Sequence, residues 1–435
     1  MEHGRHRHRS SKQARQKKPA NVLTRGIYDY TVEKEKRRDG CAGGLGQERE
    51  PPVSLQPREL PKRYTLYEPM LLLGPNFATQ TPAWEEFYSV LTAAEKQLLF
   101  RTIAKAFSDA GHNVTHVAVN APIAPKLENE DAGENVMRSP VNLQPLYGDF
   151  GPDSLLRAHS SQPAQADFDA AFWVEALQPG GSKQVWAPRW TMFSRGNVSE
   201  KARVLGLAQW NQSPFPGLSG AELGHDIEMV DVVDFYVGIG YFAFPYLKRN
   251  VRRVFGWEIN GWSVEGLRKG CERNGIRCEV VRVPDSADEV QQKAVVERVV
   301  DVLRKQPDVR CIVFWGDNLF AASILSRVGE ALMGGAPSLN VRHCNLGLLP
   351  TSRDSWAGAA EVIDPVQGGW LHVHENAEIE EVEQKKRYVV DGLANLARQM
   401  KGRSWQVSCE HTEMVKTYAP GVGHFVFDVR LWPAT

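Results

Sequence analysis

The spacing of apolar residues changes once near the start of the chain, and the change separates a tail from a folded part. Residues 1–61 are rich in Arg, Lys, Gly, Gln, Glu and Pro and lack apolar periodicity, which predicts a disordered basic tail. Beyond the tail, 66–73 is strongly apolar, 84–106 has helical spacing, and 115–123 has the composition of a strand. We therefore predict a small α/β domain over 62–200.

Farther along, short apolar segments alternate with segments of helical spacing, as they do in a parallel α/β sheet. We predict strands within 230–242, 251–258, 278–283, 309–315, 341–350 and 368–376, and helices over 263–273, 288–305, 321–333 and 378–400. Two alternating segments, 405–409 and 423–431, lie around Tyr418-Ala-Pro-Gly421 and predict an antiparallel hairpin. A mostly parallel, doubly wound sheet with such a hairpin is the class I S-adenosylmethionine-dependent methyltransferase-like (Rossmann-like) fold, which we predict for 201–435.

The turn after the first of these strands is the most informative segment of the chain. An apolar run ends at Asp234 and passes over Gly238 and Gly240 into an apolar helix. Closely spaced glycines let the backbone approach a nucleoside without interference from Cβ atoms. The next strand ends at Glu258, where an acid typically binds ribose hydroxyls. The alternative is a buried strand with a tight turn, but together these residues predict an adenosine-binding domain with S-adenosylmethionine as the favoured ligand.

The composition of the chain indicates the cellular compartment of the protein more than the reaction that it performs. The 435-residue chain has six cysteines without a C-x-x-C pair, which predicts free thiols in a reducing compartment and no zinc site. No apolar run approaches a membrane span and no secretory signal is present, so we expect a cytoplasmic protein with no membrane partner. The formal net charge is zero, but basic patches lie at 248–253, 268–277 and 385–387. Each patch could bind nucleic acid, and the alternative is an ordinary charged surface that faces solvent.

Several segments together resemble the tRNA wybutosine-synthesizing protein 2 family, and the resemblance covers roughly 185–435. These segments are Arg189-Trp-Thr-Met-Phe-Ser-Arg-Gly-Asn-Val-Ser-Glu-Lys-Ala-Arg203, Asp234-Phe-Tyr-Val-Gly-Ile-Gly-Tyr-Phe242, Trp257-Glu-Ile-Asn260, Gly316-Asp-Asn318, Asn345-Leu-Gly-Leu-Leu-Pro350, Gly368-Gly-Trp-Leu-His-Val-His-Glu-Asn376 and Val415-Lys-Thr-Tyr-Ala-Pro-Gly421. The family transfers the 3-amino-3-carboxypropyl group of S-adenosylmethionine to C7 of 4-demethylwyosine at position 37 of tRNA(Phe). The resemblance therefore implies an enzyme of wybutosine biosynthesis that releases methylthioadenosine.

The resemblance also implies a cofactor site. Ser194 and Lys201 stand where the family places a hydroxyl and a cation on the methionyl tail. Asp317 and Asn318 would contact the adenine edge, and Glu258 the ribose. The structural alternatives are a capping Ser194, a surface Lys201 and an Asx turn at 317–318. The interval before Asp317 is longer than is usual in the family, so residues 285–307 look like an inserted helix.

The reaction implied is a substitution in which C7 attacks the γ-carbon of the methionyl group and methylthioadenosine leaves. Positioning should matter more than acid–base chemistry, and no catalytic residue is assigned. The candidates for a base that removes the C7 proton are His374, Glu375 and Asp354. Candidates for stacking on the acceptor base, once it has left its own stack, are Trp190, Phe193 and Tyr241, with core packing as the alternative.

The partner implied is the anticodon arm of tRNA(Phe), held by the small domain and the basic patches, and no obligate protein partner is evident. The related tRNA guanosine-37 N1-methyltransferases are the first alternative. They differ from this chain at Ser194-Arg-Gly-Asn197 and at Leu346-Gly-Leu-Leu349. The second alternative is a non-catalytic tRNA-binding protein that retains the cofactor fold.

Overall fold

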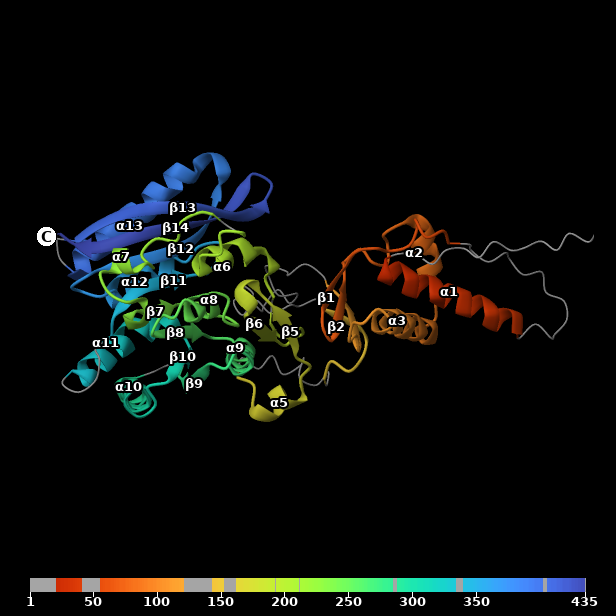
Figure 1. The fold of residues 1–435 in the computed structure, drawn as a ribbon, viewed down its shortest axis with the longest axis horizontal. Coiled ribbons are helices and arrows are strands. Elements are labelled where there is room, and N and C mark those ends of the chain that lie inside the picture. The colour runs from red at the N-terminus through yellow and green to blue at the C-terminus, as the bar shows by residue number, and fades with distance from the viewer. Residues whose placement is uncertain are drawn as a thin grey trace, which may run out of the picture. The chain divides into compact units, whose positions relative to one another are not determined.

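The computed structural model describes residues 21–40, 55–120, 143–151, 162–191, 193–210, 212–284, 288–333, 339–401 and 405–434. The described residues fall into two compact units (Figure 1). One contains the described residues up to 120 together with 143–150, and the other contains those from 151 onward.

The described residues of the first unit form a four-stranded sheet and three helices. In chain order its elements are α1 (Val22–Gly40), β1 (Tyr64–Tyr67), β2 (Met70–Leu73), α2 (Pro82–Ser89), α3 (Ala93–Ser108), β3 (His116–Val119) and β4 (Gln144–Tyr147). The sheet order is β1-β2-β3-β4, in which β2 and β3 are parallel and the other pairs are antiparallel. Thr92 and Glu95 form a capping box that fixes the start of α3.

The helix α1 corrects the prediction of a disordered tail over 1–61. Leu23, Ile27 and Tyr30 recur at helical spacing and are fully buried in the core of this unit. A Cβ on Gly26 would lie 2.8 Å from the Cα of Ile103, so α1 packs closely against α3. The polar residues of α1 mask this apolar stripe in the sequence. The rest of the predicted tail, apart from 55–61, lies outside the described residues.

The second unit contains an eight-stranded sheet of order β13-β14-β12-β11-β7-β8-β10-β9. The strands are β7 (Asp231–Asp234), β8 (Arg253–Glu258), β9 (Arg277–Arg282), β10 (Val309–Trp315), β11 (Val341–Leu346), β12 (Gly369–Glu378), β13 (Trp405–Ala419) and β14 (Val422–Pro433). Strands β7 to β12 pair in parallel, whereas β13 and β14 form the antiparallel hairpin. This topology confirms the predicted class I methyltransferase-like fold.

Helices cover both faces of this sheet. They are α8 (Ala243–Lys248), α9 (Gly261–Arg273), α10 (Glu289–Lys305), α11 (Ala321–Leu332), α12 (Trp356–Val362) and α13 (Val382–Lys401). Three further helices, α5 (Gln165–Ala170), α6 (Val198–Leu205) and α7 (Gly220–Leu223), precede them among the described residues. Successive strand residues point to opposite faces: Val232 joins the core beneath α8 and α9, and Val233 joins the core beneath α10 to α13. The strands are therefore buried on both sides, as their continuous apolar runs predict.

The segment expected to be an inserted helix forms α10, which packs on the sheet through Val295, Val299 and Leu303. The strand before it, β9, lies at the edge of the sheet, and β10 takes the place beside β8. Trp315 of β10 pairs with Glu258 of β8. The extra length therefore does not separate the end of β10 from Glu258.

The boundary predicted at residue 200 is wrong, because the second unit already contains the described residues from 151 onward. The hairpin of β5 (Val174–Leu177) and β6 (Lys183–Trp186) packs on α9. Trp262 of α9 stacks on Trp190 at a centroid distance of 4.8 Å and meets Phe168 edge-on at 5.1 Å. These aromatic contacts join the segment to the larger sheet, and polar loop residues between them conceal the connection in the sequence.

Candidate cofactor site at the carboxyl ends of the strands

A turn at the end of β7 forms the centre of the candidate site. After Asp234 the chain passes over Gly238 and Gly240, whose φ angles of 53° and 86° lie in the left-handed region that favours glycine. A Cβ on Gly240 would lie 2.6 Å from side-chain atoms of both Leu267 and Phe244. The backbone of the turn therefore requires the glycine at position 240 on steric grounds alone.

Glu258 ends β8 directly beside this turn. Its Oε2 accepts a hydrogen bond from the Gly238 N–H at 3.1 Å, and its Oε1 accepts one from the Asn260 N–H at 2.8 Å. Burial raises the pKa of the Glu258 carboxyl to about 7, although the two backbone donors favour its ionised form. A carboxylate fixed in this position is suited to accept hydrogen bonds from ribose hydroxyls.

Asp234 is buried and only half satisfied. Its Oδ1 accepts hydrogen bonds from the Tyr236 N–H and from Nδ2 of Asn345, both at 3.2 Å. Its Oδ2 is buried and has no hydrogen-bond partner in the described part of the chain. Burial raises the pKa of the Asp234 carboxyl to about 7. A buried acceptor without a donor is costly, which suggests that a ligand supplies the donor.

Asp317 and Asn318 follow the end of β10 and lie near the same turn. The Gly316 N–H donates to the carbonyl of Glu258 at 3.0 Å, which ties the two strand ends together. Nδ2 of Asn318 donates to the carbonyl of Phe235 at 2.7 Å. Oδ1 of the exposed Asp317 accepts the Leu319 N–H at 2.8 Å, so the Asx turn considered as an alternative does form. Oδ2 of Asp317 and Oδ1 of Asn318 accept none of these hydrogen bonds.

Lys201 of α6 is not a surface residue, because its side chain is only 1% exposed. Its Nζ donates to Oε1 of Gln178 at 2.9 Å and to Oε1 of Gln184 at 3.0 Å. Nε2 of Gln184 in turn donates to the carbonyl of Gly240 at 3.2 Å, which links Lys201 to the glycine turn. Burial without an opposing charge lowers the pKa of the Lys201 ammonium to about 7. The spacing of Gln178 and Gln184 along the chain does not indicate that they bind the Lys201 ammonium.

Ser194 lies at the start of the short 3₁₀ helix Arg195–Asn197, but its side chain does not cap that helix. Its N–H donates to the Tyr241 hydroxyl at 3.1 Å, and the Tyr241 ring lies 5.0 Å from Nζ of Lys201. Ser194, Lys201 and the glycine turn are therefore neighbours. Of the other aromatic candidates, Phe193 stacks on Trp186 at 4.1 Å and Trp190 stacks inside the unit, so both have the packing role considered as the alternative.

The three candidate bases differ in their surroundings. His374 is buried on β12, where its Nδ1 lies 2.9 Å from Nε2 of His424 and its ring lies 5.2 Å from that of Phe242. Its Nε2 has no hydrogen-bond partner among the described residues. Glu375 is buried and already accepts hydrogen bonds from the chain, whereas Asp354 is exposed.

A buried ion-pair network holds α6 against the hairpin, and the sequence does not indicate it. Arg203 donates to both oxygens of Glu200, at 2.8 and 2.7 Å, and to Oδ2 of Asp428 on β14 at 2.7 Å. His372 lies 2.6 Å from the other oxygen of Asp428. Burial opposes ionisation of Asp428, but Arg203 and His372 hold its pKa down at about 2. Lys201 is therefore presented by a firmly anchored helix.

Three cysteines far apart in sequence come together in the second unit. The sulfur atoms of Cys271, Cys278 and Cys311 lie within 4.8 Å of one another, although no C-x-x-C pair indicates the cluster. The sequence-based prediction that the protein holds no metal stays a prediction. No helix in the described ranges is long and apolar enough to cross a membrane.

The chain is similar to proteins of known name. It is 34% identical over 378 residues to tRNA wybutosine-synthesizing protein 2 of Schizosaccharomyces pombe, a match that covers 87% of this chain and 74% of that protein. It is 30% identical over 403 residues to the Saccharomyces cerevisiae protein of the same name, covering 85% of this chain and 74% of its relative. A solved P. horikoshii TYW2 structure in complex with MeSAdo is 15% identical, with a TM-score of 0.49, covering 92% of this chain and 99% of that one. No family model matches the chain.

Proposed function

Because the chain belongs to the tRNA wybutosine-synthesizing protein 2 family, we propose that it is the aminocarboxypropyltransferase of wybutosine biosynthesis. It transfers the 3-amino-3-carboxypropyl group of S-adenosylmethionine to C7 of 4-demethylwyosine at position 37 of tRNA(Phe). The observation that supports this function most strongly is the 34% identity to a named member of the family over 87% of the chain.

The residues around the glycine turn fit this group donor. When bound, S-adenosylmethionine supplies a sulfonium that activates the γ-carbon, so that the carbon–sulfur bond breaks as C7 bonds to that carbon and methylthioadenosine leaves. Lys201 offers a buried cation that has no carboxylate partner in the part of the chain that the structure describes, which suits the carboxylate of the methionyl tail. Oδ2 of Asp234 offers a buried acceptor that suits the ammonium group of the same tail.

The nucleoside part has its own set of groups at the neighbouring strand ends. Glu258 would accept hydrogen bonds from the ribose hydroxyls, in the orientation fixed by the N–H groups of Gly238 and Asn260. Asp317 and Asn318 would offer acceptor oxygens to the adenine amine, since the Asn318 amide nitrogen is already bonded to the Phe235 carbonyl. The Asx turn at Asp317 is compatible with this role, because it holds one carboxylate oxygen and leaves the other available.

His374 is the best suited of the three candidates for the base that accepts the C7 proton. Burial and the neighbouring His424 hold the pKa of His374 well below its usual range, so the imidazole is neutral but only weakly basic. Its Nε2 has no hydrogen-bond partner in the described part of the chain. Glu375 is less suitable because it already accepts hydrogen bonds from Thr351 and Ser352.

The substrate is a tRNA, and we propose that the anticodon arm is the part bound. The first unit and the basic residues of the second would hold the arm, while the base at position 37 leaves its stack to reach the group donor. We also propose that the reaction needs no obligate protein partner.

The identity of the leaving group tests the proposal against a guanosine-37 N1-methyltransferase. With tRNA that contains 4-demethylwyosine, the released nucleoside should be methylthioadenosine, separated by chromatography from S-adenosylhomocysteine. Release of S-adenosylhomocysteine would show methyl transfer instead. If neither nucleoside forms while tRNA still binds, the protein is a tRNA-binding module that retains the fold.

A further inference from the structure

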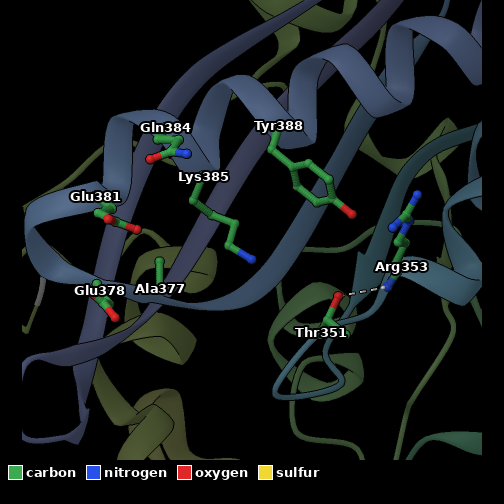
Figure 2. Close-up of a pocket in the computed structure, with 8 residues that line it drawn as sticks. All are labelled: Thr351, Arg353, Ala377, Glu378, Glu381, Gln384, Lys385 and Tyr388. Carbon is green, nitrogen blue, oxygen red and sulfur yellow. Dashed lines mark hydrogen bonds between the residues drawn. The ribbon is translucent and has the colours of Figure 1, made fainter.

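A hollow of about 400 Å³ opens at the carboxyl ends of β11 and β12, outside the set of cofactor residues (Figure 2). It lies between the loop after β11, the end of β12 and the first turns of α13. Its lining consists of Thr351, Arg353, Ala377, Glu378, Glu381, Gln384, Lys385 and Tyr388. Ligands of open α/β sheets bind at the carboxyl ends of strands, so this hollow lies at the functional edge of the sheet.

The hollow is connected to the cofactor site through the loop after β11. Asn345, the partner of Asp234, lies at the end of that strand, and the loop leads from it to Thr351. The Asn376 N–H donates to the carbonyl of Pro350 at 2.9 Å, which fixes the loop against β12. The loop therefore joins the cofactor residues to the lining of the hollow.

The buried carboxylate of Glu375 holds the walls of the hollow in place. One of its oxygens accepts the Thr351 hydroxyl at 2.7 Å and the Ser352 N–H at 3.1 Å. The other accepts Nζ of Lys385 from α13 at 3.4 Å. Loop and helix are thus tied to the same strand, and the hollow is preformed.

The lining combines a partly exposed aromatic ring with a guanidinium group. Tyr388 is 41% exposed and packs at 57° against the buried Trp356. The Arg353 guanidinium lies 5.4 Å from the Tyr388 ring centroid and forms no ion pair among the described residues. Lys385 is also 5.4 Å from that ring, but Glu375 already pairs with it. An exposed aromatic ring beside an unpaired guanidinium is the combination that binds single-stranded nucleic acid.

We propose that this hollow binds one single-stranded nucleotide of the tRNA anticodon loop, next to the nucleotide that is modified. The base stacks on Tyr388 and the phosphate contacts Arg353, while Glu381 and Gln384 at the rim offer acceptors to exocyclic amino groups. The inference rests on the proposed function, because it takes the ligand to be the same tRNA. It adds a site that holds the neighbouring nucleotide while position 37 is unstacked.

Variants of the full-length protein test the proposal. Tyr388→Leu should raise the KM for tRNA by roughly 5- to 150-fold, the range for loss of one stacked base, with kcat within about twofold. Tyr388→Phe keeps the ring and should match the unchanged protein. Arg353→Gln should reduce the slope of log affinity against log salt by about 0.7, as expected for one phosphate of a single strand. Arg327→Gln, on α11 outside the hollow, is the matched charge control.

Binding of S-adenosylmethionine and the melting temperature should not change in any of these variants, which separates a lost nucleotide contact from misfolding. An unchanged KM in Tyr388→Leu together with an unchanged salt slope in Arg353→Gln would overturn the inference and leave the proposed function intact. If the unchanged protein transfers no group at all, the proposed function fails, and the dissociation constants of the variants for an anticodon stem-loop decide this inference separately.

Discussion

At the scale of single residues, the candidate site is distinguished by three ionisable groups that have no oppositely charged partner among the described residues. Burial brings the pKa values of Lys201, Asp234 and Glu258 to about 7. Desolvated groups of this kind are expensive for the folded protein and collect at functional sites, where a ligand completes their interactions. The zwitterionic tail and the ribose of S-adenosylmethionine offer partners for all three.

Lys201→Met should separate recognition of the methionyl tail from recognition of the nucleoside. Removal of the cation should weaken S-adenosylmethionine binding by at least about tenfold, since a charge-assisted hydrogen bond is worth roughly 1.5–3 kcal/mol. Methylthioadenosine lacks the carboxylate, so its dissociation constant should stay within about twofold. Isothermal titration calorimetry measures both constants, and an equal loss for the two ligands would mean that Lys201 supports the fold and not the tail.

Asp234 should make the ligand-free protein less stable as the pH rises from about 4 to 7. Its folded-state pKa of about 7 lies above the ordinary value of 3.8, so in this window the folded protein holds a proton that the unfolded chain releases. Asp234→Asn should remove the contribution of Asp234 to this pH dependence. Glu258, whose pKa burial also raises to about 7, should still make its own similar contribution in the variant.

Denaturant unfolding at pH 5, 6, 7 and 8 measures this effect. At pH 8 we expect the Asp234→Asn variant to be more stable than the unchanged protein, by on the order of 1–3 kcal/mol. It should also bind S-adenosylmethionine more weakly. Identical pH profiles for the two proteins would contradict the account of a buried, half-satisfied carboxylate.

At the scale of elements, buried ion pairs hold the short helix α6 in place. Arg203 lies between Glu200 and Asp428, and all three side chains are almost completely buried. This network connects α6 to β14, and α6 holds Lys201 against the glycine turn. The stability of an element that is far away in sequence should therefore affect cofactor binding.

Arg203→Met should destabilise the protein by about 3–5 kcal/mol, because it leaves two buried carboxylates without their cation. Arg277→Met is the matched control, since Arg277 and Asp308 form an ion pair in which both side chains are more than half exposed. That change should cost no more than about 1 kcal/mol. Urea unfolding followed by circular dichroism measures both values, and similar costs for the two variants would contradict the role given to the network.

The elements also show how far the sequence predicts the structure. Strands β7 to β12 and the closing hairpin could be predicted because parallel strands are continuously apolar and the hairpin alternates. The helix α1 and the hairpin of β5 and β6 could not, since a few aromatic and aliphatic side chains bury them within otherwise polar segments. The glycine turn and Glu258 could be predicted as candidates because they lie at strand ends, whereas the role of Asp317 came only from the family resemblance and stays a prediction. Gln178, Gln184 and Asp428 were missed because only the tertiary fold brings them to α6.

At the scale of the whole molecule, each of the two units has a core of its own. The core of the first unit is built from α1 to α3 and the four-stranded sheet, and the cofactor residues all belong to the second unit. We therefore propose that binding of the group donor depends on the second unit alone, whereas binding of the tRNA depends on both units.

A chain of residues 151–435 should bind S-adenosylmethionine within about twofold of the full-length protein. It should lose at least about tenfold in affinity for tRNA, because the first unit no longer contributes to the interface. Calorimetry with the cofactor and fluorescence anisotropy with labelled tRNA measure the two constants. Full tRNA affinity in the shorter chain would contradict the assignment of tRNA binding to the first unit.

The most direct test of the central claim is a transfer assay on tRNA that contains 4-demethylwyosine. S-adenosylmethionine is labelled in the methyl group in one reaction and in the carboxypropyl chain in the other. The account predicts that only the carboxypropyl label enters the tRNA and that Glu258→Ala abolishes the transfer at ordinary cofactor concentrations. Label from the methyl group would contradict the account and show that the protein is a methyltransferase.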